Sequence, residues 1–157
     1  MPYILDTNII SEALKPKPDH NTIWWMQDHN EDLLFNVVSV EEVYDGIFRM
    51  PEGKRKARIR KQFDAFVKEC ANRTLPFDAF SAYLCAELAA SARKMGRPIT
   101  IEDCMIAAIC KRNDGILVTR NVKDFDYLGI ETFNPFTYEP ETLQELRHRE
   151  TERGEKR

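Results

Sequence analysis

The fold is decided by the stretch Tyr3-Ile4-Leu5-Asp6-Thr7-Asn8-Ile9-Ile10-Ser11-Glu12. An apolar run ends in an acid at Asp6, and a helical pattern starts directly after it. In an open parallel α/β sheet, ligands bind outside the carboxyl ends of the strands, where the strand order reverses. We therefore expect Asp6 at such an edge, and we expect Glu42, Asp103 and Asn121 to reach the same edge from later crossovers.

The composition is typical of a single globular domain. The chain has 157 residues, of which 43% are hydrophobic and 31% charged, and its formal net charge is -3. This charge does not mark a nucleic-acid binder, so any such role must rest on a local patch. No apolar run approaches the roughly 18 residues of a membrane span, and no secretory signal is visible at the N-terminus. We expect a cytoplasmic protein without a membrane partner.

Cysteines and histidines give no motif of their own. None of the cysteines forms a C-x-x-C pair, so we expect buried, reduced thiols rather than a zinc site or a disulfide. The histidines are scattered among polar residues, and we expect them at the solvated surface. The residues concerned are Cys70, Cys85, Cys104, Cys110, His20, His29 and His148.

Strands and helices are predicted to alternate, which indicates crossovers and a parallel sheet. The strand at residues 2–5 is short and apolar, as a central strand should be. We expect further strands at 33–39, 116–119 and 130–133, and a short extended connection at 75–77. Helices are expected at 19–29, 41–49, 55–70, 79–94 and 101–112, with a short one near 122–128. From residue 139 onward the chain is dense in charge, and a charged helix is expected around 141–150 before a frayed end.

Each candidate site residue also has a purely structural interpretation. Ser39–Glu42 fits a capping box, and Thr100–Asp103 and Asn121–Asp124 fit the same pattern more loosely. Asp6 alone could cap the first helix. Capping is the simpler interpretation of any one of them, yet four unrelated caps have no reason to converge on one sheet edge. Oxygen ligands without paired His or Cys indicate magnesium or manganese rather than zinc.

Taken together, these motifs resemble the PIN-domain family, and especially the FitB-like group of VapC-type toxins. The resemblance runs from Met1 to about Phe136 and implies a three-layer α/β/α sandwich whose central parallel sheet has four to five strands. It places a PIN domain at residues 1–137 and leaves 138–157 as a charged extension or tail. The matching segments are residues 5–12, Glu42 with Gly46, Asp103 with 106–108, 118–121 with 124–125, and 133–136.

The resemblance implies a metal-dependent endoribonuclease that is the toxin of a type II toxin–antitoxin system. By position, Asp6, Glu42 and Asp103 are the expected core acids that bind Mg²⁺ or Mn²⁺. Asn121 occupies a fourth position that is often Asp in the family. Asn121 can donate a carbonyl oxygen but adds no charge, and Asp124 is the alternative fourth ligand, although it fits better as the capping partner of Asn121. A metal held there would activate a water and neutralise charge on the phosphate.

The partners implied by the resemblance are an RNA substrate, a cognate antitoxin that lies in a groove beside the acids, and a second copy of the chain. Operator DNA is expected only through the antitoxin. The basic run at residues 54–61 either contacts RNA phosphates or forms a solvated helix face, and the solvated face is favoured. Trp24 and Trp25 cannot both face the core of one helix, so one is expected at the surface, for partner or dimer contact.

A competing interpretation is a PIN-fold binding protein of weak or no nuclease activity, acting within an antitoxin–operator complex. The amide at Asn121 gives it weight. An aspartyl phosphatase that uses Asp6 as nucleophile would need a second Asp where Asn8 stands, and no Gly-rich phosphate loop is present. The sequence leaves open the RNA target, the cleavage site, the antitoxin and the number of metal ions.

Overall fold

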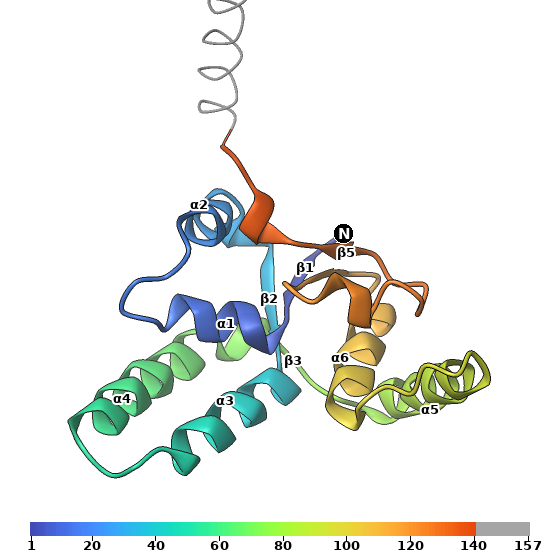
Figure 1. Ribbon diagram of the computed structural model, residues 1–157, viewed down its shortest axis with the longest axis horizontal. Helices are drawn as coiled ribbons and strands as arrows, with labels where there is room; N and C mark the ends of the chain where they lie inside the picture. Colours follow the sequence, from blue (N-terminus) through green and yellow to red (C-terminus); the bar gives the residue numbers. More distant parts are fainter. Residues whose placement is uncertain (141–157) are drawn as a thin grey trace, which may run out of the picture.

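A five-stranded parallel sheet forms the centre of the protein, whose computed structural model describes residues 1–140 (Figure 1). The strand order is β3-β2-β1-β4-β5, so β1 lies in the middle, as its apolar sequence predicts. The parallel pairing sets Leu5 beside Val118 and Ile4 beside Leu34. The strands are β1 (Tyr3–Leu5), β2 (Leu33–Asn36), β3 (Thr74–Leu75), β4 (Ile116–Val118) and β5 (Thr132–Phe133).

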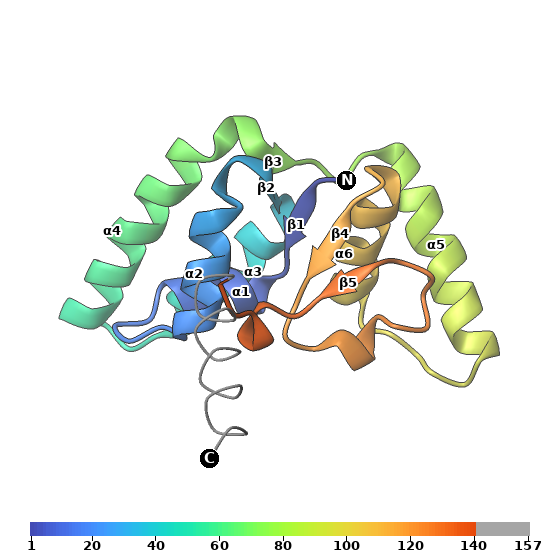
Figure 2. The same cartoon turned by 90° about the horizontal axis from the view of Figure 1, so that it is seen from above.

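Helices cover both faces of the sheet, and Figure 2 shows α1 to α4 on one side and α5 and α6 on the other. This confirms the expected three-layer α/β/α fold. The helices are α1 (Thr7–Ala13), α2 (His20–Asp28), α3 (Val37–Arg49), α4 (Lys54–Glu69), α5 (Ala79–Lys94) and α6 (Ile101–Arg112). Four short 3₁₀ turns complete the described chain: η1 (Asn30–Asp32), η2 (Ala71–Arg73), η3 (Val122–Asp124) and η4 (Pro135–Thr137).

The two layers of core follow from the alternation of side chains along each strand. Ile4 and Leu117 point into the cluster formed with α5 and α6. Their neighbours Leu5 and Val118 point into the opposite cluster, formed with α1 to α4. Successive residues of a strand face opposite sides, so strands covered on both faces must be apolar throughout. The apolar runs of the sequence are therefore explained by burial on both sides.

The boundary between β2 and α3 differs from the expectation. A strand was expected to continue to residue 39, but it ends at Asn36 and α3 begins at Val37. The Asn36 side chain caps α3, because its Oδ1 accepts a hydrogen bond from Ser39 N at 2.8 Å. The predicted Ser39–Glu42 capping box is therefore wrong, since Ser39 lies inside the helix. The β propensity of the valines at 37 and 38 is overridden by this cap.

Asn36 also ties β2 to β1. Its Nδ2 donates to Leu5 O at 2.9 Å and to Ser39 Oγ at 3.0 Å, and the residue is fully buried. We expect Asn36→Ala to lower the free energy of unfolding by about 3 kcal/mol, from the lost cap and the two stranded acceptors. Urea denaturation of the variant measures this loss. The exposed cap Asp78→Ala, which removes a bond to Ser81 N, is the control and should cost only about 1 kcal/mol.

Other expectations on individual residues are settled by burial. All four cysteines are free and buried, as expected. Trp25 is 1% exposed and Trp24 is 38% exposed, so one tryptophan of the pair does reach the surface. His29 is not a solvated surface residue, because it is half-buried and stacks on Trp25 with ring centroids 4.8 Å apart. His148 and the helix expected around 141–150 lie outside the described residues.

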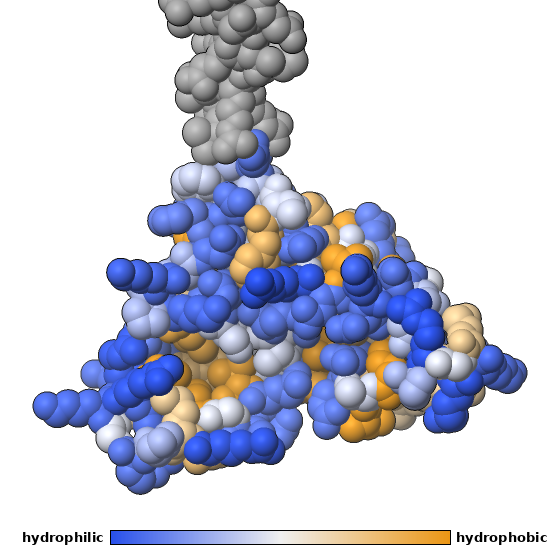
Figure 3. Space-filling view, viewed as in Figure 1, coloured by the Kyte–Doolittle hydropathy of each residue, from blue (hydrophilic) through white to orange (hydrophobic). Residues whose placement is uncertain are grey.

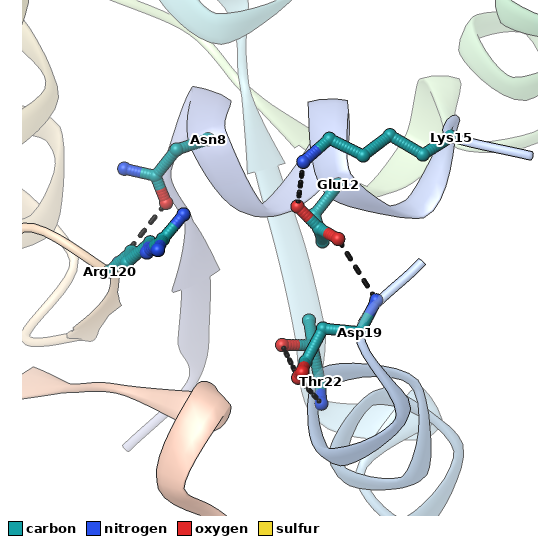
Figure 4. A network of polar contacts seen from close by, with 6 residues as sticks. All are labelled: Asn8, Glu12, Lys15, Asp19, Thr22 and Arg120. Carbon is teal, nitrogen blue, oxygen red and sulfur yellow. Dashed lines mark hydrogen bonds and ion pairs between the residues drawn. The ribbon is translucent and has the colours of Figure 1, made fainter. Parts of the chain in front are cut away.

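The connection from α1 to α2 is held by the buried carboxylate of Glu12 (Figure 4). Its Oε1 accepts from Asp19 N at 2.9 Å, and its Oε2 pairs with Lys15 Nζ at 2.5 Å. Asp19 in turn caps α2 by accepting from Thr22 N. Glu12 and Lys15 are thus engaged in holding the turn. Within residues 1–140, no helix has the length and apolar character needed to cross a bilayer.

Candidate functional site

The central acid of the site is Asp6, which follows β1 and caps α1. Its backbone N donates to Val118 O at 2.9 Å, so the sheet fixes the main chain there. Its side chain accepts from Thr7 N at Oδ1 (2.7 Å), and at Oδ2 from Asn8 Nδ2 (2.6 Å) and Thr119 Oγ1 (2.7 Å). Asp6 is only 5% exposed. Three donors from two strand ends therefore fix the orientation of one buried carboxylate.

Asn8 links the end of β1 to the segment after β4. Its Nδ2 lies 3.1 Å from Thr119 Oγ1, and its Oδ1 accepts from Arg120 N at 3.1 Å (Figure 4). Thr119 is fully buried, and its hydroxyl also accepts from Asn121 N at 3.0 Å. Thr119 is thus packed in the core and also bonded to Asp6, which makes it part of the site.

Glu42 approaches from the second turn of α3 and is held by Thr7. The Thr7 hydroxyl donates to Glu42 Oε2 and also lies 2.9 Å from Ser39 Oγ. Both contacts join α1 to α3 beside Asp6. Glu42 therefore reaches the carboxyl end of β1 as expected, although its hydrogen-bond partner comes from α1 rather than from the start of its own helix.

Asp103 lies in the first turn of α6 and is half-buried. Thr100 caps this helix, with its Oγ1 accepting from Asp103 N at 3.2 Å, which agrees with the looser capping pattern seen in the sequence. The helix N-terminus favours an ionised carboxylate at this position. In Figure 1 the starts of α1, α3 and α6 surround the carboxyl end of β1.

The three acids affect one another's protonation. Burial raises the pKa of Asp6, and the charge of Asp103 raises it further. The hydrogen bonds that Asp6 accepts from Thr119, Thr7 and Asn8 lower this pKa but do not cancel the effect of burial. Burial also raises the pKa of Glu42, as do the charges of Asp6 and Asp103, while the bond from Thr7 lowers it. The pKa of Asp103 is raised mainly by burial. The site thus concentrates negative charge that a cation would stabilise.

The residues fit a hard cation in chemistry but do not form a ready-made ligand shell. Carboxylate oxygens are the ligands that Mg²⁺ and Mn²⁺ prefer, and Asp6, Glu42 and Asp103 supply them. However, across residues 1–140 no three Asp, Glu, His or Cys side chains are close enough together to hold a metal ion as they stand. Glu42 is turned toward the Thr7 hydroxyl. The set is therefore an electrostatically coupled group of acids.

The fourth position is occupied differently from the sequence interpretation. Asn121 precedes η3 and its exposed side chain makes no capping bond, so the predicted Asn121–Asp124 box is wrong. Asp124 is therefore not engaged in capping. The pKa of Asp103 is raised first by burial and also by the charge of Asp124, whereas the hydrogen bond with Thr100 lowers it. Asp103, Asp124 and Thr100 together line a cavity of about 420 Å³. Asp124 thus interacts with the acids, whereas Asn121 contributes its backbone N–H to Thr119.

Arg97 fixes the segment that carries Asp124. Its guanidinium lies 3.8 Å from the centroid of the Tyr127 ring, and its Nη2 donates to Lys123 O at 2.8 Å. It also pairs with Asp126 at 3.4 Å. The connection between α5 and α6 thereby holds the loop after β4 in place.

Sequence reasoning assigned no role in the site to Thr7 and Asn8, which bond to the acids, or to Asn36, and it gave Ser39 only a capping role. Two signals could have found them. Thr7 and Asn8 directly follow the acid at the strand end, and Asn36 is an amide that ends an otherwise apolar strand. Polar side chains in these places need buried partners, and such partners are often the neighbouring functional groups.

Comparison with known proteins gives a matching family model and similar relatives. The family model described as the PIN domain matches residues 3–130. The "VapC ribonuclease Y4jK" of Sinorhizobium fredii (strain NBRC 101917 / NGR234) is 33% identical over 135 residues, which are 85% of this chain and 96% of that protein. The "Toxin FitB" of Neisseria gonorrhoeae (strain ATCC 700825 / FA 1090) is 30% identical over 135 residues, 85% of this chain and 97% of that protein.

A solved structure gives the same result in three dimensions. The "Structure of FitAB bound to IR36 DNA fragment" contains a chain that superposes with a TM-score of 0.81 at 30% identity. The alignment covers 88% of this chain and 99% of that one. The expected resemblance to FitB-like proteins is confirmed. The domain boundary expected at residue 137 stays a prediction.

Proposed function

Since this chain belongs to the PIN-domain family, we propose that it is a metal-dependent endoribonuclease and the toxin of a type II toxin–antitoxin system. One observation carries the proposal: Asp6, Glu42 and Asp103 come from three separate elements, and their charges interact at the carboxyl end of the central strand. Such acids are costly to hold together without a cation. Their convergence therefore supports a site for a divalent metal and a phosphodiester.

The chain's own residues have separate tasks in this proposal. Asp6, Glu42 and Asp103 would hold Mg²⁺ or Mn²⁺, which when bound lowers the pKa of a water and neutralises charge on the phosphate. Thr119 and Asn8 keep Asp6 in one orientation through hydrogen bonds of 2.7 and 2.6 Å. Asn121 was the predicted fourth ligand, and Asp124 is the better candidate because its charge raises the pKa of Asp103, ahead of the charge of Glu102.

The relatives support the substrate and the partners. One is named a VapC ribonuclease and another a toxin, and the FitAB structure is a complex bound to DNA. For this chain we propose an RNA substrate, a cognate antitoxin, and contact with operator DNA through that antitoxin. A homodimer and a cytoplasmic location belong to the same proposal.

The function is tested with purified protein and labelled RNA. Cleavage is expected with Mg²⁺ or Mn²⁺, and EDTA is expected to stop it. The products should carry a 5′-phosphate and a 3′-hydroxyl, because an activated water would attack in line with the leaving 3′ oxygen. Metal-independent cleavage, or products with a 2′,3′-cyclic phosphate, would contradict the proposed chemistry.

Asp124→Asn is expected to weaken Mn²⁺ binding by about tenfold, because it removes a charge that acts on Asp103 without changing the side-chain shape. Titration calorimetry measures the affinity. Asp126→Asn is the matched control. Asp126 lies two residues after Asp124 and pairs with Arg97, and its replacement removes the same charge. Equal affinities in the two variants would remove Asp124 from the metal site.

A second candidate is a PIN-fold binding protein with little nuclease activity, acting within an antitoxin–operator complex. Two observations favour it: an amide at Asn121, and the lack of a closed three-acid ligand shell in residues 1–140. A metal titration with RNA separates the candidates. Metal binding without cleavage of any RNA tested, together with operator binding by the antitoxin complex, would support the second.

A further inference from the structure

The turn that ends α5 brings Arg97 to the segment after β4. Gly96 has a φ of +69°, a left-handed conformation that costs glycine little because it has no Cβ. Its backbone N donates to Arg93 O at 3.0 Å. The backbone N of Arg97 donates to Ala92 O, also at 3.0 Å. These two bonds form a Schellman motif, which ends the helix, and Figure 2 shows the chain returning from there past η3 to the start of α6.

The Arg97 side chain is attached to that segment by two close contacts. Its guanidinium lies 3.8 Å from the centroid of the Tyr127 ring, and its Nη2 donates to Lys123 O at 2.8 Å. The Tyr127 hydroxyl donates back to Arg97 O at 3.2 Å. The ion pair with Asp126 is 3.4 Å long and joins side chains that are 48% and 51% exposed, so it adds little. The ring and the carbonyl therefore carry the attachment.

Asp124 lies between two anchored neighbours. Lys123 is bonded to Arg97, whereas Phe125 is 1% exposed and packs in the core with α5 and α6. Asp124 itself is exposed, and Figure 3 shows mostly hydrophilic side chains over this part of the surface. Without Arg97, the backbone of Asp124 would keep its anchor at Phe125 and lose the one at Lys123.

Arg97 shares a cavity with two acids but is bonded elsewhere. Asp103, Asp124 and Arg97 all line the cavity of about 420 Å³. Within residues 1–140, Arg97 forms no ion pair with Asp103 or Asp124, and its pair is with Asp126. A positive charge beside the acids would by itself repel a bound cation. The position of Arg97 is therefore explained by what it holds and not by its charge.

We propose that Arg97 is a positioning residue of the metal site: by holding Lys123 O and the Tyr127 ring, it keeps Asp124 at the cavity beside Asp103 and raises the affinity for the metal. This rests on the proposed metal-dependent function, in which Asp124 is the fourth acid. Groups that orient metal ligands from outside the ligand shell change metal affinity by about 10- to 100-fold when they are replaced.

The experiment measures Mn²⁺ affinity by titration calorimetry in the absence of RNA. Arg97→Gln should bind Mn²⁺ about tenfold more weakly than wild type. Arg97→Lys should also bind more weakly, because an ammonium group lacks the planar fork that both lies on Tyr127 and donates to Lys123 O. A role through charge alone predicts the opposite, with tighter binding by the glutamine variant and no change in the lysine variant. Either of these results overturns the proposal.

The matched control is Arg112→Gln. Arg112 lies 5.2 Å from the centroid of the Phe80 ring and pairs with Asp78 at 3.5 Å, so the same charge and the same kinds of contact are removed. It is at the opposite end of α6 from Asp103 and should leave Mn²⁺ affinity unchanged. Thermal unfolding without metal compares the stability of the two variants. Equal losses of affinity in both would show a general effect on the fold and overturn the role of Arg97.

A double variant tests whether Arg97 acts through Asp124. If it does, Arg97→Gln/Asp124→Asn should bind Mn²⁺ about as weakly as Asp124→Asn alone, since the carboxylate that Arg97 positions is already lost. Independent effects would multiply to a loss of about 100-fold. That larger loss would overturn the positioning of Asp124 by Arg97.

The outcomes separate this proposal from the proposed function. Weaker Mn²⁺ binding by Arg97→Gln, in a protein whose wild type cleaves no RNA, supports the positioning role and overturns the ribonuclease. Equal Mn²⁺ affinity of Arg97→Gln and a wild type that does cleave RNA overturns the positioning role and leaves the ribonuclease in place. Absence of Mn²⁺ binding by wild type overturns the positioning role, because no affinity remains for Arg97 to raise.

Discussion

Asp6→Asn should lower metal-dependent RNA cleavage by at least about 10³-fold, because it removes the charge of the acid at the centre of the site. The side chain keeps its shape, and its oxygen can still accept from Thr7 N, which caps α1. The new amide nitrogen would lie beside Asn8 Nδ2 and Thr119 Oγ1, which both donate to Asp6 in wild type. The Thr119 hydroxyl can rotate and accept a hydrogen bond from this amide. Single-turnover cleavage of labelled RNA measures the loss.

Two checks make this result specific to the site. The midpoint of thermal unfolding should stay within about 4 °C of wild type, which corresponds to about 1 kcal/mol for a chain of this size. Asp45→Asn, which alters an exposed acid paired with Arg49, should cleave like wild type. Undiminished cleavage by Asp6→Asn would reject the assignment of Asp6 and the metal site built around it.

The second large effect is on stability as a function of pH and metal. Burial and like charge raise the folded-state pKa values of Asp6, Glu42 and Asp103 above 3.8 for Asp and 4.5 for Glu. The folded state therefore takes up protons first as the pH falls. In metal-free protein, the free energy of unfolding should therefore rise as the pH drops from about 8 through the folded-state pKa values of these acids. The gain should end near the lower pKa values of the unfolded chain, where the unfolded state also binds protons.

Metal should replace protons in this role. At about pH 8 and 100 times the dissociation constant, Mn²⁺ should add about 2.7 kcal/mol, or about 5–10 °C in the unfolding midpoint. At about pH 5 the shift should shrink, because protons compete for the same carboxylates. Scanning calorimetry with Mn²⁺ or EDTA at both pH values measures it. The Asp6→Asn/Asp103→Asn variant should lose the increase of the unfolding midpoint with Mn²⁺ and the gain in stability at low pH. If Mn²⁺ raised the midpoint of this variant as much as that of wild type, the ion would bind elsewhere.

Much of the architecture is predictable because local signals agree with tertiary structure. The helices at 79–94 and 101–112 lie where the apolar spacing and their flanking polar residues predict them. The central place of β1 follows from its apolar residues, which need burial on both faces. β3 was expected only as an extended connection, because two residues at Thr74–Leu75 are too few to show a pattern.

The site was predictable in part for the same reason. Acids that follow apolar strands reach one edge of a parallel sheet, which places Asp6 by topology. The contacts that orient the acids are not visible in the sequence. Asn8 and Thr119 are 111 residues apart, and Thr7 and Glu42 are 35 apart, so only the folded chain brings them together. The start of α3 was missed because two valines favour a strand, and the cap at Asn36 decides otherwise.

The Thr7 hydroxyl carries a single proton but has two oxygen neighbours, Glu42 Oε2 and Ser39 Oγ, the latter 2.9 Å away. If Glu42 turned toward a bound ion, the Thr7 hydroxyl could donate its hydrogen bond to Ser39 Oγ instead. The Thr7 hydroxyl would then keep a hydrogen-bond acceptor. Releasing Glu42 would therefore cost less free energy than breaking a hydrogen bond whose donor is left unsatisfied. Two oxygen neighbours for one hydroxyl would therefore let Glu42 change its rotamer without a movement of the backbone.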